Sequence, residues 1–237
     1  MKRLVPLLHR RRLAPLALLA WLAPTSALAD SSDEPSVPDP MPVPRGFQLG
    51  ARLGYSLPVG QVSNNPNLST SLSNLETATV PIGIDAGYRF SPSTYLGGTL
   101  AWGPGIAPNS QGTCGFGDSC FRQDAQLRVE GRLYLAPDAK KGGWLGLGVG
   151  WEIAAFSDSH LGHTITSTLT GPVFADLELG LDFRRRSFAM GPYIGVTLAE
   201  FLTEGVNPAT APVSTSISDP SIHVWVTLGL RGSYGPW

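Results

Sequence analysis

The stretch FRQDAQLRVEGRLYLAP, residues 121–137, alternates between polar and less polar side chains. A period of two is typical of a β-strand, because successive side chains point to opposite faces of the sheet. The segment therefore predicts a strand, but its period does not say which face lies against water. The polar row consists of Arg122, Asp124, Gln126, Arg128, Glu130 and Arg132.

Seven further segments show the same kind of alternation. We expect strands over residues 46–60, 80–90, 95–103, 144–156, 173–183, 188–201 and 221–234. Tight turns alternate with long polar connections, which cover residues 60–77, 104–120, 157–171 and 203–220. This order predicts an all-β fold, an eight-stranded antiparallel up-and-down transmembrane barrel with four long loops at one end.

The polar rows indicate which face lies inside. A soluble lipocalin-like barrel or sandwich would bury the apolar rows, whereas an outer-membrane barrel turns them toward lipid. The polar rows contain no lysine and many glycines, unlike a water-facing surface. Their bases and acids are nearly equal in number, as a packed interior requires. We expect a lumen charge network of Arg52, Asp85, Arg89, Arg122, Asp124, Arg128, Glu130, Arg132, Glu152, Asp176, Glu178, Asp182 and Arg231.

Aromatic and charged residues outside these rows are also unevenly placed. Aromatics near the strand ends are typical of the interfacial girdles of membrane barrels. The short turns carry bases, whereas the long loops carry acids, an asymmetry natural for a barrel oriented across a membrane. The expected girdle residues are Phe47, Tyr55, Tyr88, Phe90, Trp102, Trp144, Trp151, Phe183, Phe188 and Tyr234, and the loop acids are Glu76, Asp118, Asp158, Glu204 and Asp219.

Three segments carry a family resemblance: GFQLGARLGYSLPVG (46–60), VPIGIDAGYRFSP (80–92) and WVTLGLRGSY (225–234). They resemble the small eight-stranded outer-membrane β-barrel proteins of Gram-negative bacteria, the OmpA-, OmpW- and OmpX-like group. The resemblance covers the chain from about residue 45 onward. It implies an outer-membrane location, contact with outer-membrane lipids, and assembly by an insertion machinery that reads a terminal aromatic residue. The alternation points to Tyr234 as that residue, although the sequence ends in Trp237.

The first 44 residues differ in composition from the rest. A basic start, an apolar run and an A-x-A pattern ending at Ala29 predict a cleaved signal peptide over residues 1–29. The pattern favours the general secretion route. The adjacent Arg11 and Arg12 are also a feature of twin-arginine signal peptides, which are the alternative. Residues 30–44, rich in Pro, Ser and acids, predict a disordered periplasmic tail before a barrel over 45–237. A chain beginning at Asp30 would carry 12 bases and 18 acids, which argues against a nucleic-acid partner.

The two cysteines, Cys114 and Cys120, lie close together in GTCGFGDSC. In an exported protein such a pair predicts a disulfide that closes a small loop. The spacing, without a nearby histidine, is a poor metal site.

One local cluster suggests chemistry, the SDSHLGHTITS segment with Asp158, Ser159, His160 and His163. A Ser/His/Asp set can support hydrolysis, and paired histidines can bind a metal. Here the residues fall in a predicted loop and lack a clear third ligand, so we interpret them as a solvated polar loop. His223, on the polar row of the last strand, is expected to be a satisfied lumen histidine.

The predicted function is that of a non-catalytic outer-membrane barrel, a monomer with a structural or surface-interaction role and no cofactor or metal. Its surface ligand is not predicted. Three alternatives stay open from the sequence. They are a narrow passage for small or hydrophobic solutes, a lipid A-modifying enzyme, and a soluble periplasmic barrel that binds a small molecule.

Overall fold

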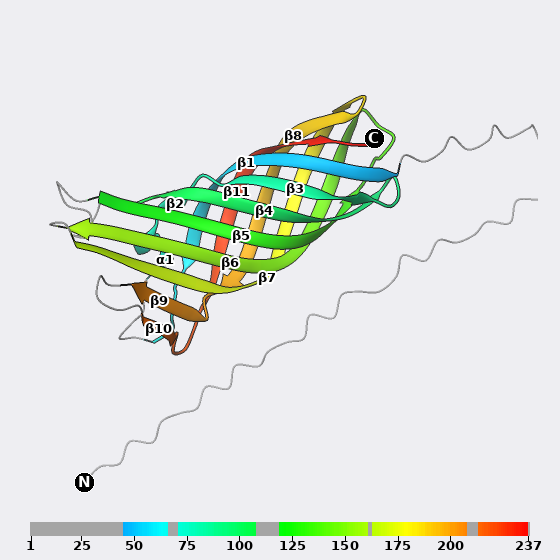
Figure 1. Ribbon diagram of the computed structural model, residues 1–237. Coiled ribbons are helices and arrows are strands. Elements are labelled where there is room, and N and C mark those ends of the chain that lie inside the picture. The colour runs from blue at the N-terminus through cyan, green and yellow to red at the C-terminus, as the bar shows by residue number, and fades with distance from the viewer. Residues whose placement is uncertain (1–44, 66–70, 108–118, 161–162, 208–212, 237) are drawn as a thin grey trace, which may run out of the picture. The chain divides into compact units, whose positions relative to one another are not determined.

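The computed structural model describes residues 45–65, 71–107, 119–160, 163–207 and 213–236. Eight long strands pair in antiparallel order around a ring, which β1 closes by pairing with β11 (Figure 1). The predicted up-and-down eight-stranded barrel is therefore confirmed. The strands of the ring are β1 (Gly46–Gly60), β3 (Ile82–Arg89), β4 (Thr94–Ile106), β5 (Ser119–Tyr134), β6 (Lys141–His160), β7 (His163–Arg185), β8 (Phe188–Glu200) and β11 (Ile222–Tyr234).

Four small elements lie at the long-loop end. The first loop contains the one-turn helix α1 (Leu72–Leu75) and the short strand β2 (Ala78–Thr79). The last loop contains β9 (Thr203–Asn207) and β10 (Val213–Ser216), which form a hairpin whose β9 edge pairs with β7. Within the described ranges, no helix is long and apolar enough to cross a membrane.

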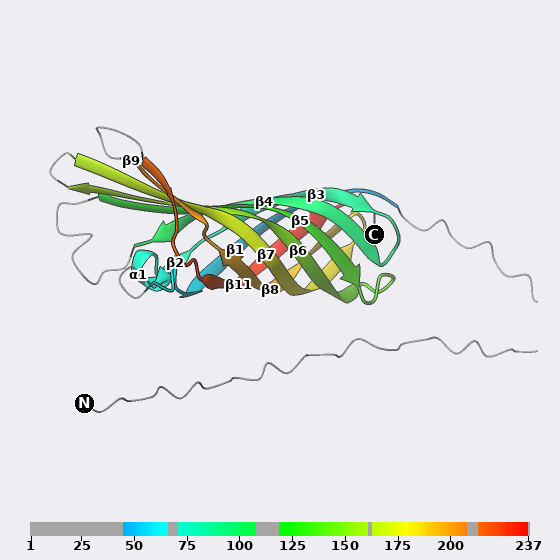
Figure 2. The same cartoon turned by 90° about the horizontal axis from the view of Figure 1, so that it is seen from below.

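The predicted long loop over residues 157–171 is wrong. Strands β6 and β7 continue through most of this segment, and their ends project with β5 and β9 beyond the neighbouring strands (Figure 2). Hydroxyl pairs support the extension: Ser157 with Thr166 at 2.9 Å and Ser159 with Thr164 at 2.7 Å. One face carries hydroxyl residues and the other mixes Ile165, Ser167 and Leu169, so the regular apolar row that marks the rest of the barrel is missing here.

Side chains alternate between a polar interior and an apolar exterior. On β5, Leu127 and Val129 are 62% and 59% exposed, whereas Arg128 and Glu130 are 7% and 2% exposed. The same contrast recurs on the other strands of the ring, whose leucines, isoleucines and valines cover the outer surface. The charges of residues 121–137 therefore face inward.

A β-bulge changes this alternation on β7. The pairing with β6 slips between Gly148 and Gly150, and the pairing with β8 slips near Ala175. As a result Val173, predicted to face outward, is buried, and Phe174 faces outward instead. One extra residue in a strand is enough to reverse which side chains point inward.

Most expected girdle aromatics lie on the outer surface, with one exception. At the short-turn end, Tyr88 packs edge-on between Phe47 and Phe90, with ring centroids 5.4 and 5.0 Å apart. Trp144, by contrast, is buried inside the barrel. Its ring fills the space opposite Gly180, where any side chain would collide with the indole.

Candidate functional site: the charged lumen and its loop-side plug

Arg52 connects four strands inside the barrel. From β1, its guanidinium lies 2.5 Å from Glu178 on β7, 3.1 Å from Glu130 on β5 and 3.3 Å from Asp85 on β3. All four side chains are almost fully buried. Arginine suits this position because its planar fork of donors can reach several carboxylates at once.

Further arginines extend this network along the barrel. Arg132 contacts Asp85 at 3.1 Å and also pairs with Glu130, and Arg231 lies 3.4 Å from the same Asp85. Arg231 also lies 3.7 Å from Asp182.

Arg128 completes the middle of the network. It is 2.5 Å from Asp176 and 3.7 Å from Glu178. Every acid of this half of the lumen therefore faces at least one guanidinium, which compensates the cost of burying its charge.

The short-turn end of the lumen is closed by aromatic rings. Tyr95, Tyr134, Trp144 and Tyr193 are buried as one cluster. The Arg132 guanidinium lies 4.7 Å from the centroid of the Tyr95 ring and 5.5 Å from that of Trp144. Cation–π contacts and ion pairs together fill this part of the tube.

Arg89 holds the turns together below this aromatic cluster. It donates to the carbonyl oxygens of Ser91 and Pro92, and to that of Pro236 at 3.1 Å. The first and last parts of the barrel wall are thereby linked.

The structure places all thirteen residues of the expected lumen network in the interior, each at most 8% exposed. It does not bring them into one paired set. Arg89 binds backbone carbonyls, and Arg122 lies near the loops, 2.7 Å from Asp158. Asp124 and Glu152 lie with His223 in a second, loop-side group that has no arginine ion pair among the described residues.

Glu152 organises this second group. It accepts a hydrogen bond from Trp225 Nε1 at 2.7 Å and lies 3.1 Å from His223 Nε2. His223 stacks on Phe201 with ring centroids 4.3 Å apart and is an interior residue as expected, but its buried Nδ1 has no hydrogen-bond partner, so the expected satisfaction is not complete. The carboxyl group of Asp124 lies beside that of Glu152.

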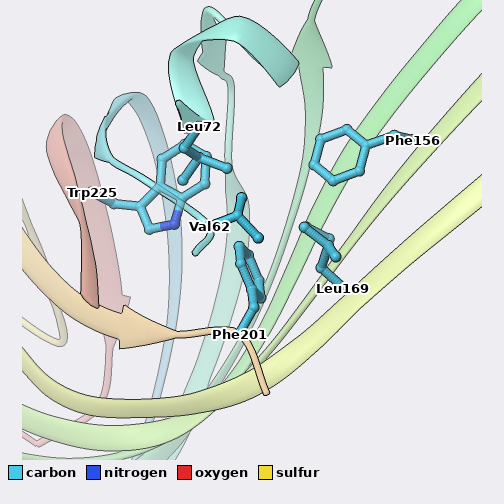
Figure 3. Close-up of a cluster of buried hydrophobic side chains, with 7 residues drawn as sticks. Val62, Leu72, Phe156, Leu169, Phe201 and Trp225 are labelled. Carbon is cyan, nitrogen blue, oxygen red and sulfur yellow. The ribbon is translucent and has the colours of Figure 1, made fainter. Parts of the chain in front are cut away.

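An apolar cluster, here called the plug, covers this group on the loop side. Figure 3 shows its side chains converging from the first loop, β6, β7, β11 and the residue after β8, Phe201. Leu72 of α1 is completely buried in it, so the first loop folds into the barrel mouth. The plug consists of Val62, Leu72, Ala154, Phe156, Leu169, Phe201 and Trp225.

Glu76 corrects one expectation about the loops. It was expected among the acids displayed on the surface, but the residue is 0% exposed and follows α1 directly into the interior. Burial raises the pKa of Glu76 to about 8, and the nearby Asp124 and Glu152 carboxyls add to the rise, whereas Arg122 opposes it. No local sequence pattern marks this residue, because its burial depends on how the loop packs.

Two cavities show how completely the interior is filled. The cavity between the arginine network and the loop-side group has a volume of about 30 Å³, little more than one water molecule needs. A second pocket of about 380 Å³ lies outside the plug, between the first loop and the extended ends of β6 and β7. At the level of the small cavity the interior is therefore closely packed.

The SDSHLGHTITS segment does not assemble a catalytic set from its described side chains. Asp158 and Ser159 are neighbours on β6, so their side chains point to opposite faces. Asp158 pairs with Arg122, and the Ser159 hydroxyl pairs with Thr164.

Three expected features fall outside what is described. They are the side chains of His160 and His163, the disulfide partner Cys114, and residues 1–44.

Three carboxylates lie close enough together to invite comparison with a metal site. Donor oxygens of Glu130, Asp176 and Glu178 are within 4.8 Å of one another. Arg52, Arg128 and Arg132 already face these oxygens and neutralise them. The cluster is therefore part of the ion-pair network and not an open cation site.

No protein-family model and no curated protein matches the sequence. Among solved structures, the outer-membrane protein OprG from Pseudomonas aeruginosa is 10% identical, with 81% of this chain and 98% of that chain covered and a TM-score of 0.46. A major outer-membrane protein from Thermus thermophilus is 13% identical, covering 79% and 98%, with a TM-score of 0.46. The outer-membrane protease OmpT from Escherichia coli is 9% identical, covering 84% and 98%, with a TM-score of 0.40. The antiparallel ring of eight strands and its apolar outer surface agree with the expected likeness to outer-membrane barrels at the level of the fold.

Proposed function

We propose that the chain is an integral outer-membrane protein of a Gram-negative cell envelope, with a closed lumen and a structural or surface-interaction role. The observation that carries this proposal is the apolar outer surface of a barrel whose interior is filled with ion pairs. In water, so many exposed leucines, isoleucines and valines would be strongly unfavourable. Against lipid the same surface is stable, and outer-membrane lipids become its partners.

Exposed aromatic side chains mark the two edges of the apolar belt on the outer surface of the barrel. At the loop side, Trp102 and Trp151 lie exposed, and the Trp102 indole donates to Gln123 at 3.2 Å. At the turn side, Phe47, Phe188 and Tyr234 are exposed. Aromatic rings with polar partners are favoured at the two membrane–water interfaces. We place the short turns in the periplasm and the extended strands outside the cell.

A surface role accounts for the strands that continue beyond the belt. The ends of β6 and β7, together with β9 and β10, form an exposed ribbon rich in Ser and Thr. Its hydroxyl pairs include Thr170 with Thr203 at 2.7 Å. Such a rigid polar sheet suits contact with an external ligand, whereas the filled lumen does not suit a solute passage.

We further propose that the protein is a non-catalytic monomer, exported with a cleaved signal peptide and carrying a Cys114–Cys120 disulfide. Insertion machinery that recognises a strand-terminal aromatic would read Tyr234, the last residue of β11. The engaged polar side chains of the SDSHLGHTITS segment support the absence of catalysis.

The decisive experiment is cell fractionation combined with gel mobility before and after boiling. We expect the protein in the detergent-extracted envelope, with a compact unboiled form that shifts on heating. Recovery as a soluble periplasmic species would contradict the proposal.

Two further measurements separate the other functions. Planar-bilayer recordings at neutral pH should show no steady conductance, and a persistent channel would favour solute passage. Mass spectrometry of lipid A from cells with and without the protein should show identical species, and a new species would favour an enzyme.

A further inference from the structure

The loop-side group of the lumen has too few positive charges for its acids. Glu76, Asp124 and Glu152 are all buried there. Both carboxylate oxygens of Glu76, and Oδ2 of Asp124, have no hydrogen-bond partner. A buried carboxylate without a partner is very unfavourable when ionised.

The nearest arginine is already occupied. Arg122 donates from Nε to the Leu75 carbonyl at 3.0 Å and from Nη1 to the carbonyls of Phe121 and Ser157, each at 3.2 Å. The same Nη1 lies 2.7 Å from Asp158. Arg122 therefore anchors the end of α1 and the β6 extension, and its charge is shared with an acid outside the group.

The other charged groups around the site do not fill the deficit. Arg128, from β5 below, is committed to Asp176 at 2.5 Å. His223, from β11, already contacts Glu152, and Glu200 on β8 adds a further acid near this imidazole. The three carboxyl groups must therefore be neutralised in another way.

The contact between Asp124 and Glu152 indicates how. Two buried carboxyl groups that lie this close repel each other when both are ionised, so the pair is stable only when it holds a proton. A Cβ added at Gly105 would collide with Oε1 of Glu76, so the glycine provides the space in which this carboxyl group lies against the barrel wall. The site is therefore shaped around neutral, protonated acids.

We propose that Glu76, Asp124 and Glu152 form a proton-binding site that locks the first loop into the mouth of the barrel. Leu72 and Glu76 lie at the two ends of the same helical turn, so the plug and the site are joined through α1. When the protons are present, the loop stays inside. When they leave, mutual repulsion drives the Glu76 carboxylate toward water, and α1 leaves with it.

The pH range of this change follows from Glu76. Because burial raises its pKa to about 8, the carboxyl group is protonated below that pH and ionised above it. The plug is therefore closed at neutral pH and open in alkaline medium. The arginine network beneath stays paired, so opening exposes the upper lumen without creating a channel.

The test is thiol labelling beneath the plug. Thr79 is buried on β2 and lines the small interior cavity, so Thr79→Cys introduces a thiol that the plug covers. A membrane-impermeant maleimide is added to outer-membrane vesicles at about pH 6 and about pH 9.5. Ser214→Cys, exposed on β10, corrects for the intrinsic pH dependence of thiol reactivity, and the parent chain serves as the blank. We expect the corrected labelling rate to rise at least about tenfold between the two pH values.

Two variants in the Thr79→Cys background make the test specific. Glu76→Gln keeps the shape but cannot ionise, so labelling should stay slow at both pH values. Gly105→Ala displaces the Glu76 carboxyl group, so labelling should be fast at both. The matched control Glu204→Gln removes a loop acid outside the site and should retain the full pH response. Gel mobility before boiling verifies that each barrel is folded.

Three outcomes would overturn the proposal. The first is a corrected labelling rate of the Thr79→Cys protein, without a second substitution, that does not change with pH. The second is an unchanged pH response in a folded Glu76→Gln protein. The third is labelling that responds to EDTA at constant pH, which would identify a bound cation in place of protons.

Discussion

Arg52 projects from β1 and contacts acids from three other strands. Removal of such a residue leaves several buried carboxylates without their partner, and the cost exceeds the strength of any single pair. The same reasoning explains why lysine is absent from the lumen. A single ammonium group cannot hold three separate carboxylates in a fixed planar arrangement.

We expect Arg52→Ala to lower the free energy of unfolding by about 3–5 kcal/mol. The measurement is urea unfolding of the folded protein in lipid vesicles, followed by tryptophan fluorescence and by gel mobility. Arg185→Ala, at an exposed position near a short turn, is the control and should change the stability by less than about 0.5 kcal/mol. Equal effects of the two variants would contradict the role given to the network.

Glu76 also predicts how stability depends on pH. Its folded pKa of about 8 lies above its ordinary value of 4.5, so the folded state holds the proton more tightly than the unfolded state does. This contribution to stability is complete below about pH 4.5 and is lost as the pH rises toward about 8. The midpoint of the heat-induced mobility shift should therefore fall more between about pH 5 and pH 9 in the parent protein than in Glu76→Gln. A parallel fall in both would exclude Glu76 as the source.

At the scale of elements, alternation was sufficient for most of the wall. Strand β1 has the predicted bounds, since its apolar row runs unbroken from Phe47 to Leu57. The alternation failed where its physical cause is absent. The β6–β7 extension has hydroxyl residues on one face and only a mixed row on the other, where Leu169 joins the plug, so register and hydroxyl pairs replace the regular inside–outside contrast.

The bulge on β7 gives a sharper case. Its extra residue reverses the orientation of Val173 and Phe174, which a period of two cannot anticipate. The plug could not be predicted from the sequence either, because Leu72 and Trp225 belong to distant parts of the chain that only the folded barrel brings together. Of the site, the sequence predicted the interior charges but not their division into a neutralised network and an acid-rich group.

Substitutions at the bulge should follow the structure and not the simple alternation. Phe174→Arg places a charge against lipid and should cost about 2–4 kcal/mol, depending on depth. Val173→Thr places a hydroxyl in a polar interior and should be mild. The two variants are compared by the amount of folded, heat-modifiable protein in the envelope fraction. A more severe defect in Val173→Thr would contradict the bulge.

For the whole molecule, the orientation of the charges predicts assembly in the membrane. Val129→Arg places a charge in the outer belt, whereas Gln126→Arg places it in the lumen, three residues away on the same strand. We expect Val129→Arg to reduce the folded envelope form far more strongly. Quantitative immunoblotting of unboiled envelope samples provides the measurement, and the opposite order would indicate a soluble barrel with its apolar rows inside.

The closure of the ring by β1 and β11 has a consequence for biogenesis. Leu49 pairs with Tyr234, so the seam joins the first strand of the ring to the strand of the ring that is made last, β11. Until β11 has been made, β1 presents unpaired backbone groups along its seam edge beside an exposed apolar face. Since contacts of such long sequence separation form slowly, the chain is exposed to aggregation until the seam closes.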